Sequence, residues 1–203
     1  MIKKILCLFL LSVLTAGTRA DEQELICYFS LSSENLATVD ALSAATAPDF
    51  NTQTVAEFMA SHTHSALYRI TSEKVYPQLM NEAMGAYQQM LMHQDKLPEL
   101  TGESIFLGNY RRIYLGYPVW LNSMPLEIKA FLKQHEKELE GKEVAIFSTT
   151  GQMSNQHSIN ELAGEFKSLK IVGSICLKRQ DKEQFKSQIT AWIDKLTDTS
   201  ERR

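Results

Sequence analysis

The sequence predicts an α/β fold, a five-stranded parallel sheet with helices packed on both of its faces. Two observations lead to this class. Short apolar runs of β-type composition alternate with segments of helical character, and this repeated strand-helix order is typical of parallel strands joined by crossover helices. The composition of the 203-residue chain, with 44% hydrophobic and 22% charged residues, is that of a globular protein and excludes a low-complexity or disordered chain.

The first twenty residues have the pattern of a secretory signal. The pair Lys3-Lys4 precedes an apolar run over 5–14, and small residues lead to a cleavage site after Ala20. The run is shorter than the roughly 20 apolar residues that span a bilayer. We therefore expect one domain over 21–203, periplasmic or secreted, with no stable membrane span after cleavage. An uncleaved N-terminal anchor is the alternative.

The first half of that domain supplies two strands and two helices. Asn51 is a favourable N-cap for the first helix, and Pro77 fits the start of the second helix or marks a break in it. The loop before Asn51 is rich in Ser, Thr and Ala and has no clean period. The predicted elements are a strand at 24–30, a loop over 31–50, a helix over 51–62, a strand at 66–70 and a helix over 73–93.

The second half continues the same alternation. Pro125 suits a first helical turn, and Gly141 suits the residue that follows a helix. Phe185, Ile189 and Trp192 recur at helical spacing near the C-terminus. The predicted elements are a connection over 97–109, a strand at 111–117, a helix over 125–138, a strand at 143–148, a helix over 156–166, a strand at 171–177 and a last helix capped by Asp181.

The cysteines, the net charge and the absence of known catalytic motifs exclude several classes of function. Cys27 and Cys176 lie in two predicted strands, and their sulfur atoms cannot meet if these strands are not neighbours in the sheet. We therefore expect two buried free thiols rather than a disulfide. No CxxC motif is present. The net charge of −3 argues against a nucleic-acid partner. Arg111 and Arg112 flank a strand and are expected to form surface ion pairs. Motifs of serine hydrolases, zinc proteases and nucleotide-binding loops are absent, so no catalytic residue and no metal ligand is assigned.

Three loops at the carboxyl ends of the strands are the candidate site. Ligands of parallel α/β sheets bind beyond these ends, near the point where the strand order reverses. The loops at 30–33 and 149–154 carry hydroxyls and an amide, and the loop at 118–123 carries a tryptophan. None of them supplies a carboxylate pair or a metal cluster. This chemistry suits a phosphorylated aromatic cofactor, which would need hydrogen-bond donors and one stacking surface.

The same segments resemble those of the flavodoxin-like FMN proteins. The resemblance covers residues 24–197, and its most specific part is LGYPVW followed by MPLEIKAFL, within 115–132. YFS at 28–30, NT with VAE at 51–57 and FSTTG at 147–151 occur in the matching order. The resemblance implies the strand order 2-1-3-4-5, in which the first and fifth strands are not neighbours.

The resemblance also implies FMN as the cofactor and assigns its contacts. The loop after the first strand and the following helix would hold the phosphate, with hydroxyl and N–H groups at a helix N-terminus suited to a dianion. The loop after the third strand would lie against the flavin ring, with Trp120 stacking on it, and the loop after the fourth would contact the ring edge. The residues are Ser30, Ser32, Asn51 and Thr52 for the phosphate, Pro118, Val119, Trp120, Leu121 and Asn122 for the ring, and Thr149, Thr150, Gly151 and Gln152 for its edge.

The expected function is electron transfer or flavin-dependent reduction outside the cytoplasm. The partners would be a redox protein or a small electron donor or acceptor, and an enzyme of this kind would be an NAD(P)H-dependent or quinone-type reductase. One departure supports a different class. About twenty residues separate Ser30 from Asn51, and Phe50 stands where relatives carry glycine. The alternative is a non-catalytic binding module that keeps the fold, has lost FMN and binds another ligand or protein.

Overall fold

The computed structural model describes most of the expected domain. The predicted signal, most of the loop over 31–50, Ser32 and Gln152 lie outside the described residues. The described residues are 24–31, 50–76, 85, 88–89, 96–151 and 153–201.

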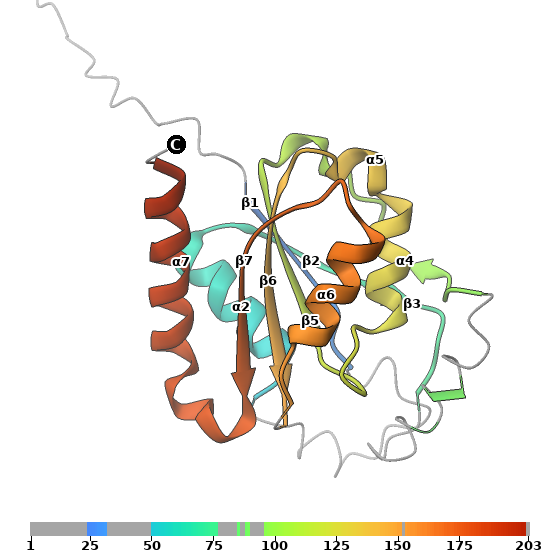
Figure 1. The fold of residues 1–203 in the computed structure, drawn as a ribbon, viewed down its shortest axis with the longest axis horizontal. Helices are drawn as coiled ribbons and strands as arrows, with labels where there is room; N and C mark the ends of the chain where they lie inside the picture. The colour runs from blue at the N-terminus through green and yellow to red at the C-terminus, as the bar shows by residue number, and fades with distance from the viewer. Residues whose placement is uncertain are drawn as a thin grey trace, which may run out of the picture.

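A five-stranded parallel sheet forms the centre of the molecule (Figure 1). Its strands follow the order β2-β1-β5-β6-β7, which is the predicted 2-1-3-4-5 once the two short strands of a separate ribbon are left out. Every pairing in this sheet is parallel. The strands are β1 (Glu24–Tyr28), β2 (Ala66–Arg69), β5 (Arg112–Pro118), β6 (Glu143–Thr150) and β7 (Lys170–Lys178).

Helices cover both faces of the sheet. In Figure 1, α2 and α7 lie on one side of the strands, and α4, α5 and α6 lie on the other. The ends of α4 and α5 meet at His135, whose backbone leaves the helical region (φ −108°, ψ 15°) and divides the single helix predicted over 125–138. The helices are α2 (Thr52–Thr63), α4 (Leu126–Gln134), α5 (Glu136–Leu139), α6 (Gln156–Glu165) and α7 (Phe185–Glu201).

The apolar strands divide their side chains between two cores. Along β1, Leu25 and Cys27 enter the core under α4 and α6, whereas Ile26 and Tyr28 enter the core under α2 and α7. This alternation follows from the strand period of two. All of these side chains are buried, which explains why the strand reads as a continuous apolar run.

The segment after β2 differs from the helix predicted over 73–93. β3 (Thr71–Ser72) and β4 (Leu100–Thr101) pair antiparallel in a small ribbon, and residues 73–76 are not helical. The Ser72 hydroxyl accepts a hydrogen bond from the Lys74 N–H, which stabilises a turn. Pro77 disfavours the helical region for the residue before it. Gly85, Gln88 and Gln89 are helical, and the other residues over 77–93 lie outside the described part of the chain.

The prediction that Asp181 caps the last helix is wrong. Asp181 lies inside the 3₁₀ segment η3 (Arg179–Gln184), with φ −98° and ψ 16°, and α7 begins only at Phe185. Phe185 is the first buried apolar residue of this stretch, so packing rather than the polar cap sets the start of α7. A second 3₁₀ turn, η2 (Leu107–Asn109), leads into β5.

Both described cysteines are free thiols, as predicted. Cys27 on β1 is buried, and burial raises the pKa of its thiol, which keeps it unreactive. Cys176 is only half-buried, because β7 is an edge strand of the sheet. β5 and β6 separate the two strands, so the sulfur atoms cannot meet. None of the helices described here is long and apolar enough to cross a bilayer.

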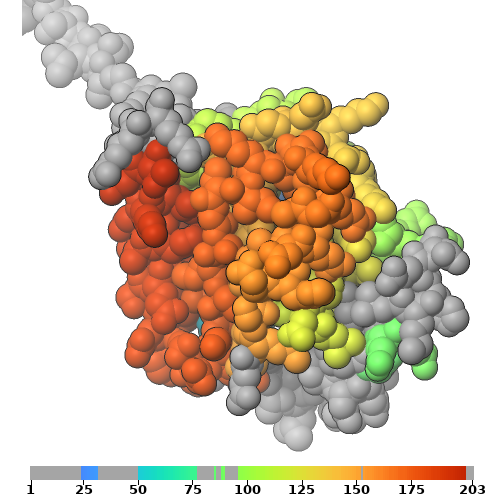
Figure 2. All heavy atoms as spheres, in the orientation of Figure 1, coloured from blue at the N-terminus to red at the C-terminus, as the bar shows by residue number. Residues whose placement is uncertain are grey.

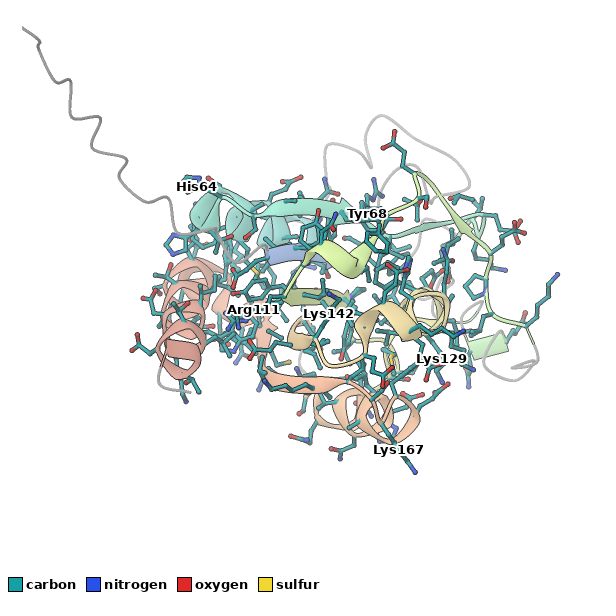
Figure 3. All side chains as sticks on the ribbon, turned by 90° about the horizontal axis from the view of Figure 1, so that it is seen from above. His64, Tyr68, Arg111, Lys129, Lys142 and Lys167 are labelled. Atoms are coloured by element: carbon teal, nitrogen blue, oxygen red, sulfur yellow. The ribbon has the colours of Figure 1, made fainter. Side chains whose placement is uncertain are left out.

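A network of ion pairs lies at the amino ends of β1, β5 and β6. Arg112 is 1% exposed rather than on the surface, and its guanidinium reaches Glu24 and Glu143, each at 2.9 Å. Arg111 and Lys170 also pair with Glu143, at 3.0 and 3.1 Å. Figure 3 looks down on this end and shows Arg111 beside it. The charged groups belong to the amino ends, so they lie at the opposite edge from the candidate site.

Candidate functional site at the carboxyl edge of the sheet

Three segments from distant parts of the sequence meet at the carboxyl edge. The Phe29 N–H donates to the carbonyl of Gly116 at 3.0 Å, and the Val119 N–H donates to the carbonyl of Thr149 at 2.9 Å. These bonds extend the sheet ladder beyond the strands and align the loops after β1, β5 and β6. Figure 2 shows the loops after β5 and β6 side by side at the lower edge of the molecule. The structure therefore brings the described predicted site residues to one edge.

The N-terminus of α2 offers unpartnered donors. Asn51 is the N-cap, as predicted, with extended backbone and a side-chain oxygen that accepts from the Thr54 N–H at 2.8 Å. Of the described residues, none gives an acceptor to the N–H groups of Thr52 and Gln53, and the first turn holds no acidic side chain. Ser30, 3% exposed, adds a hydroxyl whose one hydrogen bond within the described residues is a long one of 3.5 Å to the Leu31 carbonyl. Such a set of donors suits an anion.

A hydroxyl pair joins the two halves of the site. Thr52 Oγ1 and Thr149 Oγ1 are 2.7 Å apart, and the residues are 1% and 6% exposed. Thr52 is the first residue of α2, whereas Thr149 is the penultimate residue of β6, and the two positions are 97 apart in the sequence. The bond holds the N-terminus of α2 against the loop after β6. A ligand at α2 would therefore also lie beside that loop.

Phe50 anchors α2 instead of shaping a glycine-like turn. Its side chain is 6% exposed and packs against Phe185, with ring centroids 5.6 Å apart. It shares a core with Val55, four residues after the N-cap, in the pattern of a hydrophobic staple. Phe50 is not among the described residues with positive φ, so the position does not require the backbone freedom of glycine.

Trp120 is part of the core in this structure. It is 4% exposed, and the rings of Phe29 and Tyr76 approach it edge-on, with centroids at 5.6 and 5.3 Å. The predicted stacking platform is therefore not open at Trp120 in this arrangement. Pro118 is half-buried, and Val119 is 8% exposed beside Thr149. The exposed apolar side chain of the loop is Leu121, at 41%.

The turn after Trp120 is tight and strained. Trp120 and Ser123 exchange two backbone hydrogen bonds, of 3.0 and 2.8 Å. Leu121 and Asn122 between them have φ values of 49° and 66°. Two positive φ values characterise a type I′ turn, which favours Asn and Gly. Leucine is unfavourable there by roughly 1–2 kcal/mol, because its Cβ approaches the following carbonyl. The turn thus holds an apolar side chain at the site at a cost in stability.

The loop after β6 completes the edge. Thr150, 8% exposed, accepts a hydrogen bond from the Met153 N–H at 3.1 Å, while Gly151 is exposed. Met153 itself is 43% exposed. It lies in the predicted loop over 149–154, but the sequence assigned it no contact with the ring, because a methionine in a polar loop gives no periodic signal. Below the loop, Tyr117 hydrogen-bonds Ser158 at 3.0 Å, and burial raises the pKa of this tyrosine to about 12.

The assembled edge suits an anionic group and an apolar ring system together. The α2 N-terminus supplies N–H donors without a carboxylate, and Leu121 and Met153 supply apolar surface. No cluster of three or more His, Cys, Asp or Glu residues that could hold a metal ion occurs in the described part of the chain. The donor set therefore fits a phosphate-bearing aromatic cofactor such as FMN, on the chemistry of these residues.

Comparison with known proteins agrees with this geometry. The sequence pattern of the family described as Flavodoxin matches residues 40–196. A solved protein from Bacteroides eggerthii, assigned as a flavoprotein, is 23% identical, with a TM-score of 0.64, over 86% of this chain and 98% of that one. A flavoprotein from Lactobacillus acidophilus, solved in complex with FMN, is 21% identical, with a TM-score of 0.60, over 81% and 98%. No curated protein matches the sequence. At these identities the two structures share the fold.

Proposed function

The chain belongs to the flavodoxin family, and on that premise we propose that it binds FMN at the carboxyl edge of the sheet and uses it for redox chemistry. The L. acidophilus protein of the same fold was solved with FMN bound. When bound, FMN supplies one- and two-electron transfer, and the protein supplies binding, orientation and electrostatics.

The observation that carries the proposal is the N-terminus of α2. Thr52 and Gln53 present N–H groups that no other described residue uses, in a turn without acidic side chains. The positive end of the helix dipole favours a phosphate dianion at this position. The bond between Thr52 and Thr149 holds the loop after β6 beside the N-terminus of α2, which supports a site shared by the two segments. The phosphate and the ring would thus be held by neighbouring segments.

The remaining residues orient the ring and exclude water. Leu121 and Met153 offer apolar surface, and Thr149, Thr150 and Gly151 border it with hydroxyls and an exposed glycine. Nothing in this chemistry requires a side chain to act as general acid or base. The protein's part is therefore to set the relative stability of oxidised and reduced flavin through the groups that touch it.

The physiological role that we propose is electron transfer or flavin-dependent reduction outside the cytoplasm. The signal pattern of residues 1–20 supports the location. The net charge of −3 would favour a partner protein with a basic docking face, because opposite potentials speed association. A small electron donor or acceptor, such as NAD(P)H or a quinone, is the alternative partner, and it would make the protein a reductase.

Titration with flavins tests the proposal. The purified chain is titrated with FMN and, in parallel, with riboflavin, while flavin fluorescence and visible absorption are recorded. We expect saturable binding of one FMN per chain, and riboflavin weaker by about tenfold or more, equivalent to about 1.4 kcal/mol from the phosphate. Absence of FMN binding by a folded chain would refute the proposal and favour the binding module that has lost FMN.

A further inference from the structure

Glu127 is a buried carboxyl that the proposed flavin chemistry does not use. It lies in the first turn of α4 and is 0% exposed. Tyr76 donates its hydroxyl to Glu127 Oε1 at 2.7 Å, and Ser72 donates to the same oxygen at 3.2 Å. Oε2 is also buried, and it has no hydrogen-bond partner in the described structure. Both hydroxyl groups therefore donate to Oε1, whereas Oε2 receives no hydrogen bond from the described residues.

This geometry suits the neutral acid. A carboxylate spreads its charge over both oxygens, so a buried oxygen without a donor costs free energy. In the neutral acid, Oε1 is the carbonyl that accepts both bonds, and Oε2 carries the proton. A buried neutral O–H without a partner costs less free energy than a buried charge without one. Burial raises the pKa of Glu127, and the hydrogen bonds from Tyr76, from the Glu127 backbone N–H and from Ser72 offset only part of the rise. Lys74 is the charged group whose field reaches the carboxyl, and it favours the ionised form.

Tyr76 connects this carboxyl to the loop at the site. Its ring packs against Trp120 at 5.3 Å between centroids, with planes at 67°. Trp120 begins the strained turn that carries Leu121. Tyr76 is 0% exposed, so its hydroxyl cannot exchange Glu127 for water without a change in packing. A negative charge on Glu127 would therefore disturb the packing of Tyr76, and through Tyr76 the packing of Trp120 in the loop after β5.

We infer that Glu127 is a pH-sensitive positioning residue, which in its neutral form holds Tyr76 against Trp120 and so fixes the loop after β5. Ionisation of the carboxyl at higher pH loosens that contact and frees the loop. The consequence for FMN rests on the proposed function, because the freed loop is the one expected to lie against the flavin ring.

The positioning role of Glu127 is tested in the absence of flavin, with the fluorescence of Trp120 as the readout. The chain has two tryptophans, so Trp192→Phe leaves Trp120 as the single reporter. Quenching by acrylamide is measured from about pH 5 to pH 9, above the ordinary pKa of a glutamate, because burial raises the pKa of Glu127. We expect a sigmoidal rise in the quenching constant with pH. Glu127→Gln, which keeps an oxygen acceptor for Tyr76 and cannot ionise, is expected to abolish the rise and to stay at the low-pH value.

Two further variants separate this role from a general effect on folding. Glu165→Gln on α6 removes a glutamate whose ion pairs are with Lys129 and Lys133, and it should keep the wild-type profile. Tyr76→Phe keeps the ring and removes the hydroxyl, so the profile should become flat. A flat profile in the reporter protein itself, or an unchanged rise in Glu127→Gln, would overturn the inference. Circular dichroism at each pH confirms that the variants are folded.

FMN titration at the two ends of the same pH range then tests the consequence. The dissociation constant of the reporter protein should increase with pH, and that of Glu127→Gln should not. If FMN binds at neither pH, the proposed function fails, while the fluorescence profile still decides the role of Glu127. If the profile shows the transition but FMN affinity does not follow it, the carboxyl positions the loop, and the link to the flavin is refuted.

Discussion

The positive charge of buried Arg112 is compensated by two carboxylate partners, Glu24 and Glu143. Glu143 receives hydrogen bonds from Arg112 Nε and Nη2 at 3.2 and 2.9 Å, and Lys170 and Arg111 pair with the same side chain. Burial alone would raise the pKa of Glu143, but the hydrogen bonds from Arg112 and Lys170 outweigh it and hold the pKa below its ordinary value. The network therefore favours the folded state as long as Glu143 is ionised.

The sign of this effect predicts acid sensitivity. A carboxyl whose pKa is lowered by folding stabilises the protein above its unfolded pKa, and the stabilisation is lost as the pH falls through the folded value. Glu143→Gln should lower the free energy of unfolding at neutral pH by about 3 kcal/mol, because it leaves Arg112 with one partner fewer. It should also lose less stability than wild type below the ordinary pKa of 4.5.

Urea unfolding at several pH values measures this prediction. Glu165→Gln is the matched control, since it removes a glutamate with more exposed lysine partners and should cost less than about 1 kcal/mol. Equal losses for the two variants, or identical acid profiles for Glu143→Gln and wild type, would show that the buried network does not stabilise the fold. Glu127 acts with the opposite sign, because its raised pKa makes stability fall as the pH rises.

At the scale of elements, the N-terminus of α2 links stability and ligand binding. Asn51→Asp keeps a side-chain oxygen at the N-cap, and its negative charge is favourable to the helix. The same charge repels a phosphate a few ångströms away, by about 1–2 kcal/mol in a solvent-like dielectric. We expect the affinity for FMN to fall about tenfold, while riboflavin affinity and the melting temperature stay at or above wild type.

The comparison of the two flavins separates charge from structure. Asn51→Ser, which keeps a neutral cap, should bind FMN like the wild type. Calorimetric titration gives both affinities. Equal losses for FMN and riboflavin in Asn51→Asp would mean that the substitution distorts the site and that the phosphate does not lie at α2.

The turn over 120–123 is the second element with a testable cost. Asparagine tolerates positive φ better than leucine, so Leu121→Asn should raise the free energy of unfolding by about 1 kcal/mol. The same change removes apolar surface at the site, so FMN affinity should fall. Thermal unfolding and flavin titration are the measurements. A variant with unchanged stability would argue against strain at Leu121, and one with unchanged affinity would argue against its contact with the ring.

At the scale of the molecule, the main sheet could be predicted from the sequence, whereas the small β3–β4 ribbon and the burial of Arg112 could not. The five strands of the main sheet contain apolar runs, and each predicted segment overlaps an observed strand by most of its length. β3 and β4 have two residues each and leave no period to detect. Arg112 reads as a surface residue, because its burial depends on Glu24 and Glu143 from distant strands.

The candidate site shows the same division. Asn51 as N-cap and the meeting of the three loops follow from local signals and from the strand order. The burial of Trp120 does not, because it depends on Phe29 and Tyr76, which contact it only in the folded chain. The unpartnered Oε2 of Glu127 has no sequence signal either, since its environment is set by packing across elements.

The most direct test of the account is a map of FMN binding on the ¹⁵N-labelled chain, by amide chemical-shift perturbation. We predict that the largest shifts fall at the carboxyl edge, at the N–H groups of Thr52 and Gln53 and in the loops that contain Leu121 and Gly151. The amides around Arg112 and Glu143, at the opposite end of the sheet, should not move. Shifts centred on that opposite end, or no shifts at saturating FMN, would contradict the account.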